Sequence, residues 1–233
     1  MVVKIARDGL APGELAREAE LLGRIRAAAG SEQDFLDLRL PLPVAVGISS
    51  GPVAAGQEVL LLRAEVGIWG SGADLLPLHP RGIDPRHVVW IWRRILELLA
   101  PLHGRRWVHG DIALEHLLLM PEDHGCLLAG WACAAPGVPG ASLKQPTPVR
   151  DLAQTAWCMR ALVCGGEEPD HLPDDVPGPL RTLLDRCAGD TAWLAALGAA
   201  GLDAEIQRAS REAFGPPAFL PFIPGAPASG RTR

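Results

Sequence analysis

Hydrophobic residues recur along the chain at two spacings, one typical of strands and one typical of helices. Short apolar runs predict strands in six places, at residues 2–5, 41–49, 57–66, 107–108, 117–120 and 126–128. Apolar positions three and four residues apart predict one helix that begins after Gly13 and a longer one that begins at Asp84. The pattern therefore predicts a chain with both element types, strands first and mainly helices later.

The long helix carries the clearest signals. Asp84 is a good N-cap and Pro85 is favoured at the first helical position. Its apolar stripe falls on one face, at Val88, Ile91, Ile95, Leu98 and Leu102. Residues 123–125 form a turn signal that predicts a hairpin between the two strands that flank it. Residues 67–82 and 134–148 are expected to be loops.

The C-terminal part is expected to be helical. A helix at 151–163 is apolar on nearly every side, which is typical of a helix in the centre of a domain, and Gly165-Gly166 is expected to end it. Two further helices are predicted around residues 178–187 and 202–213. Residues 214–222 hold three of the four phenylalanines, so this tail is expected to dock on the body, and disorder is expected from Ala226.

Composition limits the classes of function. The 233 residues, 48% of them hydrophobic and 21% charged, suffice for one core or two small lobes. A net charge of -5 argues against a nucleic-acid partner, which would need a basic surface. No apolar run reaches the ~18 residues of a membrane span, and no secretory signal is visible, so no membrane association and a cytoplasmic location are expected. The excess of arginine over lysine indicates a bacterium with a GC-rich genome.

Five cysteines are present, without a CxxC pair. Buried thiols in a reducing compartment are the expected state. A zinc site built from Cys126, Cys133, His116 and His124 is the alternative.

One short segment, His109-Gly110-Asp111, carries the most chemistry. It follows an amphipathic helix and precedes a hairpin, and it resembles the catalytic loop of the protein kinase-like superfamily. The central glycine and Ala113 are more similar to the aminoglycoside phosphotransferases. The resemblance spans roughly residues 1–166 and implies that Asp111 accepts the proton of the attacking hydroxyl. A turn aspartate in a strand-to-strand loop is the plainer alternative.

Two N-terminal residues extend the resemblance. Val2-Val3-Lys4 resembles the strand whose lysine holds the ATP phosphates, and Lys4 is one of only two lysines in the chain. Glu18 resembles the helix glutamate that pairs with this lysine, and its place in an apolar stripe also favours a cationic partner. The resemblance therefore implies that Lys4 and Glu18 bind the cofactor. Glu14 and Glu20 are alternative carboxylates, and a surface lysine is the alternative for Lys4.

The positions that would bind magnesium depart from the family pattern. His116 stands where the family has a metal-ligand asparagine, and imidazole suits magnesium poorly, so a packed or capping histidine is the favoured alternative. Ala129-Gly130-Trp131 stands where the family has Asp-Phe-Gly, so Trp131 is expected to act as a core residue and the chief metal carboxylate is missing. Asp123 lies nearby, but on the hairpin turn. Only three residues precede Lys4, too few for the Gly-rich hairpin that covers ATP phosphates.

His109 and Asp151 are two further residues that are expected to have structural roles. Asp151 opens the buried helix, and the resemblance implies that it braces the loop at His109 through backbone hydrogen bonds. Favourable placement near the positive end of the helix dipole is an alternative that is compatible with this role.

The prediction is a reduced protein kinase-like α+β fold. It comprises a truncated β-rich N-lobe at residues 1–66, a helical C-lobe at 67–213 and a docking tail at 214–233. The expected function is that of a catalytically impaired pseudokinase that binds or regulates another protein, without a firm cofactor and with weak or absent magnesium. The alternative is an atypical ATP-dependent kinase that acts on a small molecule or protein through Asp111. A structural or assembly factor that docks through the tail is a third possibility.

Overall fold

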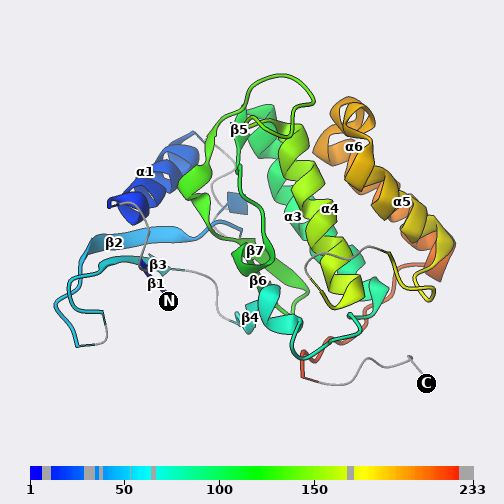
Figure 1. Cartoon of the computed structure of the whole chain (residues 1–233), viewed down its shortest axis with the longest axis horizontal. Helices are drawn as coiled ribbons and strands as arrows, with labels where there is room; N and C mark the ends of the chain where they lie inside the picture. The colour runs from blue at the N-terminus through cyan, green and yellow to red at the C-terminus, as the bar shows by residue number, and fades with distance from the viewer. Residues whose placement is uncertain are drawn as a thin grey trace.

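The computed structural model describes residues 1–6, 12–28, 35–36, 39–52, 54–63, 67–166 and 171–225. Within these ranges the chain is α+β, with antiparallel sheets in its N-terminal part and a mainly helical C-terminal part (Figure 1). The strands are β1 Val2–Ile5, β2 Leu42–Ile48, β3 Glu58–Arg63, β4 Gly70–Ser71, β5 Trp107–Val108, β6 Leu117–Met120, β7 Gly125–Leu128 and β8 Ala135–Pro136. The α-helices are α1 Glu14–Ala27, α3 Pro85–Gly104, α4 Pro148–Cys164, α5 Gly178–Gly189 and α6 Thr191–Phe214. Short 3₁₀ turns cover Ala73–Leu75, Leu114–His116 and Trp131–Cys133.

The first sheet positions Lys4. Its strand order is β1-β3-β2, with all neighbours antiparallel, and Lys4 lies opposite Leu60 of the central strand. Helix α1 packs on this sheet, as Figure 1 shows. The predicted strand pair at 41–49 and 57–66 is confirmed as β2 and β3, while residues 64–66 lie outside the described ranges.

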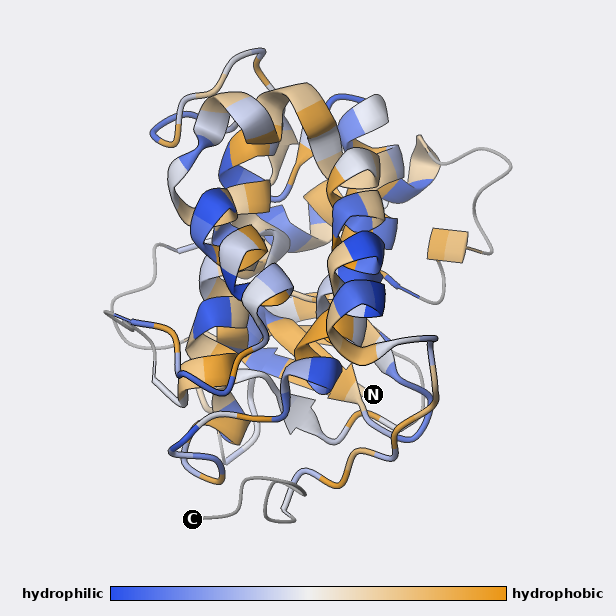
Figure 2. Ribbon diagram, turned by 90° about the vertical axis from the view of Figure 1, so that its right-hand side faces the viewer, coloured by the Kyte–Doolittle hydropathy of each residue, from blue (hydrophilic) through white to orange (hydrophobic). Residues whose placement is uncertain are grey.

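Helix α3 is the centre of the helical part. It packs against α4 and α6 and against strands β5 and β7. The predicted apolar stripe is buried along its whole length, and Trp92 is buried with it, donating from its indole nitrogen to Thr155 Oγ1 at 2.8 Å. In Figure 2 hydrophobic residues lie between the helices and on the central strands, while hydrophilic residues lie along the outer helix sides. The helices and the inner strands therefore share one hydrophobic core.

Two helix starts differ from the prediction. Helix α4 begins at Pro148, because Thr147 is its N-cap and accepts from the Arg150 N–H at 3.1 Å; Asp151 lies within the first turn. Helix α6 begins at Thr191, where Asp190 caps it, and not near residue 202. The two glycines at 198 and 201 weaken the sequence pattern there, and Gly198 breaks the helix geometry (φ 62°, ψ −176°). Two predicted loops also contain short strands, β4 and β8.

The segment after α6 packs on the body of the molecule. The Phe222 side chain is buried against the ring of His87, with 4.4 Å between centroids, and Phe219 stacks on His124 at 4.3 Å. His124 Nε2 also donates to the Leu220 carbonyl at 2.8 Å. Residues 215–225 therefore form a strap (the C-terminal strap), whereas Phe214, expected in the tail, ends α6. The disorder expected from Ala226 concerns residues outside the described ranges.

Among the residues that the structure describes, no helix combines the length and apolar character that a membrane span requires.

Candidate functional site

A buried carboxylate joins three segments that are distant in sequence. Glu18 is fully buried on α1, and one of its oxygens pairs with the Lys4 ammonium from β1. Its other oxygen accepts from the backbone N–H of Trp131 at 3.1 Å. Both carboxylate oxygens are therefore engaged, as burial of a charge requires. Of the three candidate glutamates, Glu18 is the one that pairs with Lys4, while Glu20 is exposed.

Asp151 holds the loop that contains Asp111. Its carboxylate is fully buried and accepts from the backbone N–H groups of His109 and Gly110, each at 2.8 Å. His103, at the end of α3, donates to the same carboxylate at 2.9 Å. These are the backbone hydrogen bonds that the resemblance implied for Asp151. The loop is therefore fixed to α3 and α4 together.

The glycine at 110 is required by this loop. Its φ of +82° lies in the left-handed region, and a Cβ there would lie 2.8 Å from the Cys133 carbonyl oxygen. On the other side of Asp111, Gln154 Oε1 accepts from the Ile112 N–H at 3.1 Å. In the sequence, Gln154 is marked only as a polar position on a largely apolar helix. A lone amide on such a helix is the signal that could have identified it.

His109 is a buried connector between Asp111 and the 129–131 segment. Its Nδ1 accepts from the Asp111 N–H at 3.2 Å, and its Nε2 donates to the Ala129 carbonyl at 2.9 Å. The ring also packs edge-on against Trp131, with centroids 4.5 Å apart. Burial lowers the pKa of His109 to about 4, so the imidazole is neutral, as its accepting Nδ1 demands.

His116 packs over a glycine. Its Nδ1 donates to the Asp111 carbonyl at 2.7 Å and lies 4.0 Å from the Asp111 carboxylate. A Cβ on Gly130 (φ +83°) would lie 2.4 Å from the His116 ring, so only glycine fits beneath it. The side chain of Asp111 is 48% exposed. The loop thus presents one accessible carboxylate on a rigid backbone.

The segment at residues 129–131 supplies no side-chain ligand for a magnesium ion. Across the described ranges, no group of three or more His, Cys, Asp or Glu side chains could hold a metal. Beside Asp111, the Ala129 carbonyl is occupied by His109, and Gly130 has no side chain. The same result excludes the alternative zinc site, since Cys126, Cys133, His116 and His124 do not form a cluster. Burial raises the pKa of the Cys126 thiol to about 12.

One contact at the site had no signal in the sequence. Glu58 on β3 reaches the N-terminus of α1, where its carboxylate oxygens accept from the Leu15 N–H at 3.2 Å and the Ala16 N–H at 3.0 Å. Gly13, the N-cap, has no side chain for this purpose. Glu58 therefore ties the helix that carries Glu18 to the sheet that carries Lys4.

A comparison with protein-family models found no match for this chain, and a comparison with curated proteins found no similar sequence.

Proposed function

We propose that the chain is a reduced kinase-like domain that has lost metal-dependent phosphoryl transfer and acts as an interaction or regulatory module for another protein. The proposal is supported by the segment 129–131, which connects the Lys4–Glu18 pair with the loop that contains Asp111. Glu18 and Lys4 reach it through the Trp131 N–H, and Asp111 reaches it through His109. This arrangement is compatible with the kinase-like resemblance of the sequence.

The observation that carries the loss of activity is the chemistry of that segment. Phosphoryl transfer depends on positioning and on charge neutralisation by metal ions. Magnesium needs several oxygen ligands in an octahedral arrangement. Ala129 and Gly130 supply no side-chain oxygen, and the neighbouring His116 offers imidazole with Nδ1 already bonded. Asp111 alone cannot hold a metal and a phosphate in line.

The test is thermal unfolding with ATP, with and without magnesium. We expect the midpoint with Mg-ATP to equal the midpoint with ATP plus EDTA, because the described residues hold no group of three or more His, Cys, Asp or Glu side chains that could bind the metal. Lys4→Met serves as the control for any metal-independent nucleotide effect, since Lys4 is the cation that pairs with Glu18. Stabilisation by several degrees that requires magnesium would contradict the proposal.

A second candidate function is favoured by one observation, the accessible Asp111 carboxylate on a loop held by Asp151. In this alternative the chain is an ATP-dependent phosphotransferase with Asp111 as the base. It predicts ATP turnover that disappears in Asp111→Asn and persists in Asp123→Asn, a matched change on the hairpin turn. Turnover that survives Asp111→Asn excludes it.

A further inference from the structure

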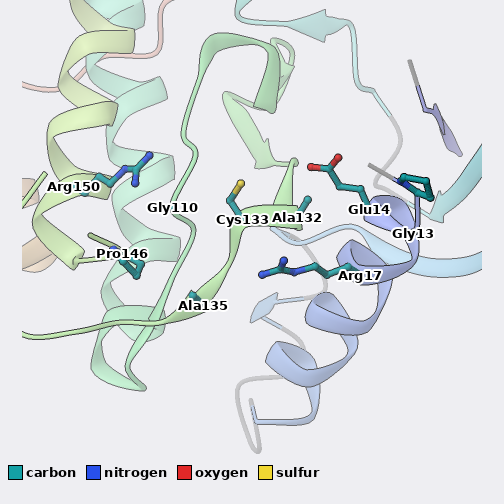
Figure 3. A pocket seen from close by; sticks show the side chains of 10 residues that line it. Gly13, Glu14, Arg17, Gly110, Ala132, Cys133, Ala135, Pro146 and Arg150 are labelled. Carbon is teal, nitrogen blue, oxygen red and sulfur yellow. The ribbon is translucent and has the colours of Figure 1, made fainter. Parts of the chain in front are cut away.

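A cavity of about 460 Å³ lies beside the Asp111 loop, outside the Lys4–Glu18 pair. Its walls come from the start of α1, the start of α4 and the 132–135 segment, and Figure 3 shows the side chains that line it. Gly110 contributes to the floor. A cavity of this size suits a small ligand or a single side chain of a partner.

Two arginines enter this cavity from opposite walls. Arg17 extends from α1 and Arg150 from α4, and in Figure 3 their guanidinium groups point toward the space between the two helices. Within the described part of the chain, neither guanidinium makes a hydrogen bond or an ion pair. Other arginines do so, for example Arg93 with Asp203 and Arg94 with Glu97. Two unpaired guanidinium groups that share one cavity leave many hydrogen-bond donors free.

The positions of these arginines are electrostatically unfavourable without a ligand. Both lie close to helix N-termini, where the positive end of the helix dipole disfavours cations. The carboxylate of Glu14 also lines the cavity, so the lining side chains carry two positive charges and one negative charge. An anion between the arginines would offset this excess.

Cys133 lies between the two arginines in Figure 3. Burial raises the pKa of its thiol, and the Asp111 and Glu14 carboxylates raise it further, against the opposing effect of Arg150 and Arg17. A thiol of raised pKa is protonated at neutral pH and a weak nucleophile. The cavity is therefore suited to binding, with the guanidinium groups as its recognition elements.

We propose that this cavity binds a phosphate monoester through Arg17 and Arg150. A phosphate dianion has three terminal oxygens and can accept from two guanidinium forks at once, whereas a single carboxylate is satisfied by one. The cavity is larger than a phosphate ion, so it also has room for the group that carries the ester. The inference does not depend on a kinase-like function, because neither Lys4 nor Glu18 lines the cavity.

The experiment is calorimetric titration with O-phosphoserine and with inorganic phosphate, at constant ionic strength adjusted with chloride. We expect binding of both, with each of Arg17→Gln and Arg150→Gln weakening it about tenfold and the double variant abolishing it. Arg208→Gln, on α6, is the matched control, because it removes an exposed arginine that does not line the cavity and should leave binding unchanged. A phosphoserine peptide that binds more tightly than free phosphoserine would indicate a protein ligand, and the reverse order a small-molecule ester.

Unfolding without ligand separates loss of binding from loss of folding. Because neither guanidinium has a partner within the described residues, we expect the double variant to be at least as stable as the wild type. The proposal is overturned if phosphoserine and inorganic phosphate fail to bind above the chloride background. It is also overturned if the double variant, folded by this measure, binds phosphoserine within about threefold of the wild type.

Discussion

At the scale of single residues, the site depends on carboxylates that are buried and fully bonded. Glu18 and Asp151 have no exposed surface, yet every carboxylate oxygen has a partner. Each one joins elements that are far apart in sequence, so each acts as a structural link as well as a site residue. Removing a single partner leaves a charge or a polar group unpaired in the interior, which is costly.

The Lys4–Glu18 pair allows this cost to be measured. We expect Lys4→Met to lower the free energy of unfolding by about 2 kcal/mol, since the buried Glu18 carboxylate loses its cation. The value is below that of a fully buried pair because the Lys4 side chain is 27% exposed. Lys4→Met combined with Glu18→Gln should recover part of the loss, because the uncharged amide can still accept from the Trp131 N–H.

Urea unfolding of the four proteins in this double-mutant cycle provides the measurement. The matched control is Lys144→Met, which removes the other lysine, exposed in the 138–146 loop. If Lys4→Met unfolds at the same urea concentration as wild type and control, the ion pair does not stabilise the fold. The proposed link between β1 and α1 would then lose its energetic basis.

At the scale of elements, α1 is held from three sides. Its apolar face packs on the sheet, Glu18 ties its centre to Trp131, and Glu58 caps its first turn. Helix starts usually receive their cap from a residue close in sequence. Here the cap comes from residue 58 because the N-cap position, Gly13, has no side chain.

Removing the remote cap should loosen the helix that presents Glu18. We expect Glu58→Ala to lower the free energy of unfolding by about 1 kcal/mol, as two N–H groups lose a charged acceptor. Glu20→Ala, an exposed glutamate on α1, serves as the control and should change stability by less than about 0.5 kcal/mol. Chemical denaturation gives both values, and equal effects of the two substitutions would contradict the capping role of Glu58.

The elements that sequence reasoning identified are those with a local signal. The stripe of α3 and the strand pair β2–β3 follow from the spacing of apolar residues, and both are present. The start of α6 could not be predicted from the spacing of apolar residues, because Gly198 and Gly201 interrupt the helical pattern. Packing against α3 and α5 stabilises this part of the helix instead. Helix α4 was expected to begin at Asp151, but it begins at Pro148 because Thr147 is its N-cap.

The same limit applies to the site. The Lys4–Glu18 contact was predictable, because a carboxylate in an apolar stripe needs a cation. The Glu58 cap and the cavity between Arg17 and Arg150 were not, because they depend on how α1, β3 and α4 approach one another in space. No periodic pattern records such long-range geometry.

At the scale of the whole molecule, the C-terminal strap closes the helical part. Residues 215–225 return from α6 to α3 and the β6–β7 turn, and they pack on a set of histidines. His124 and His79 both bond strap carbonyls, of Leu220 at 2.8 Å and of Pro224 at 2.5 Å. His87 differs from these two, since its Nδ1 accepts from the Trp90 indole N–H at 3.3 Å while its ring packs on Phe222. An accepting Nδ1 requires the neutral ring.

Acid should therefore destabilise the molecule through its buried neutral histidines. Burial lowers the pKa of His87 to about 4, with the Asp84 carboxylate opposing the shift and His124, Arg86 and His79 adding to it; the pKa of His109 is also about 4. In the unfolded chain both groups protonate near pH 6.5. Below that pH the unfolded state binds more protons than the native state. The free energy of unfolding therefore keeps its full value with respect to these two histidines above about pH 6.5, and it falls as the pH drops toward 4.

For a shift of this size, each histidine should remove on the order of 2 kcal/mol between pH 7 and pH 5. Urea unfolding at both pH values measures this loss of unfolding free energy. Since His87 and His109 contribute about equally, His87→Leu should remove about half of the loss. The same substitution should also lower stability at pH 7, because the contact with Trp90 is lost. His171→Leu, at an exposed position, is the matched control. Because the rings of His87 and Trp90 both contact Phe222, protonation of His87 should also change the tryptophan fluorescence on acidification. This change should be larger in the wild type than in His87→Leu. A pH dependence unchanged by His87→Leu would assign the whole loss to His109 and to the loop of Asp111, and the strap would then be insensitive to acid.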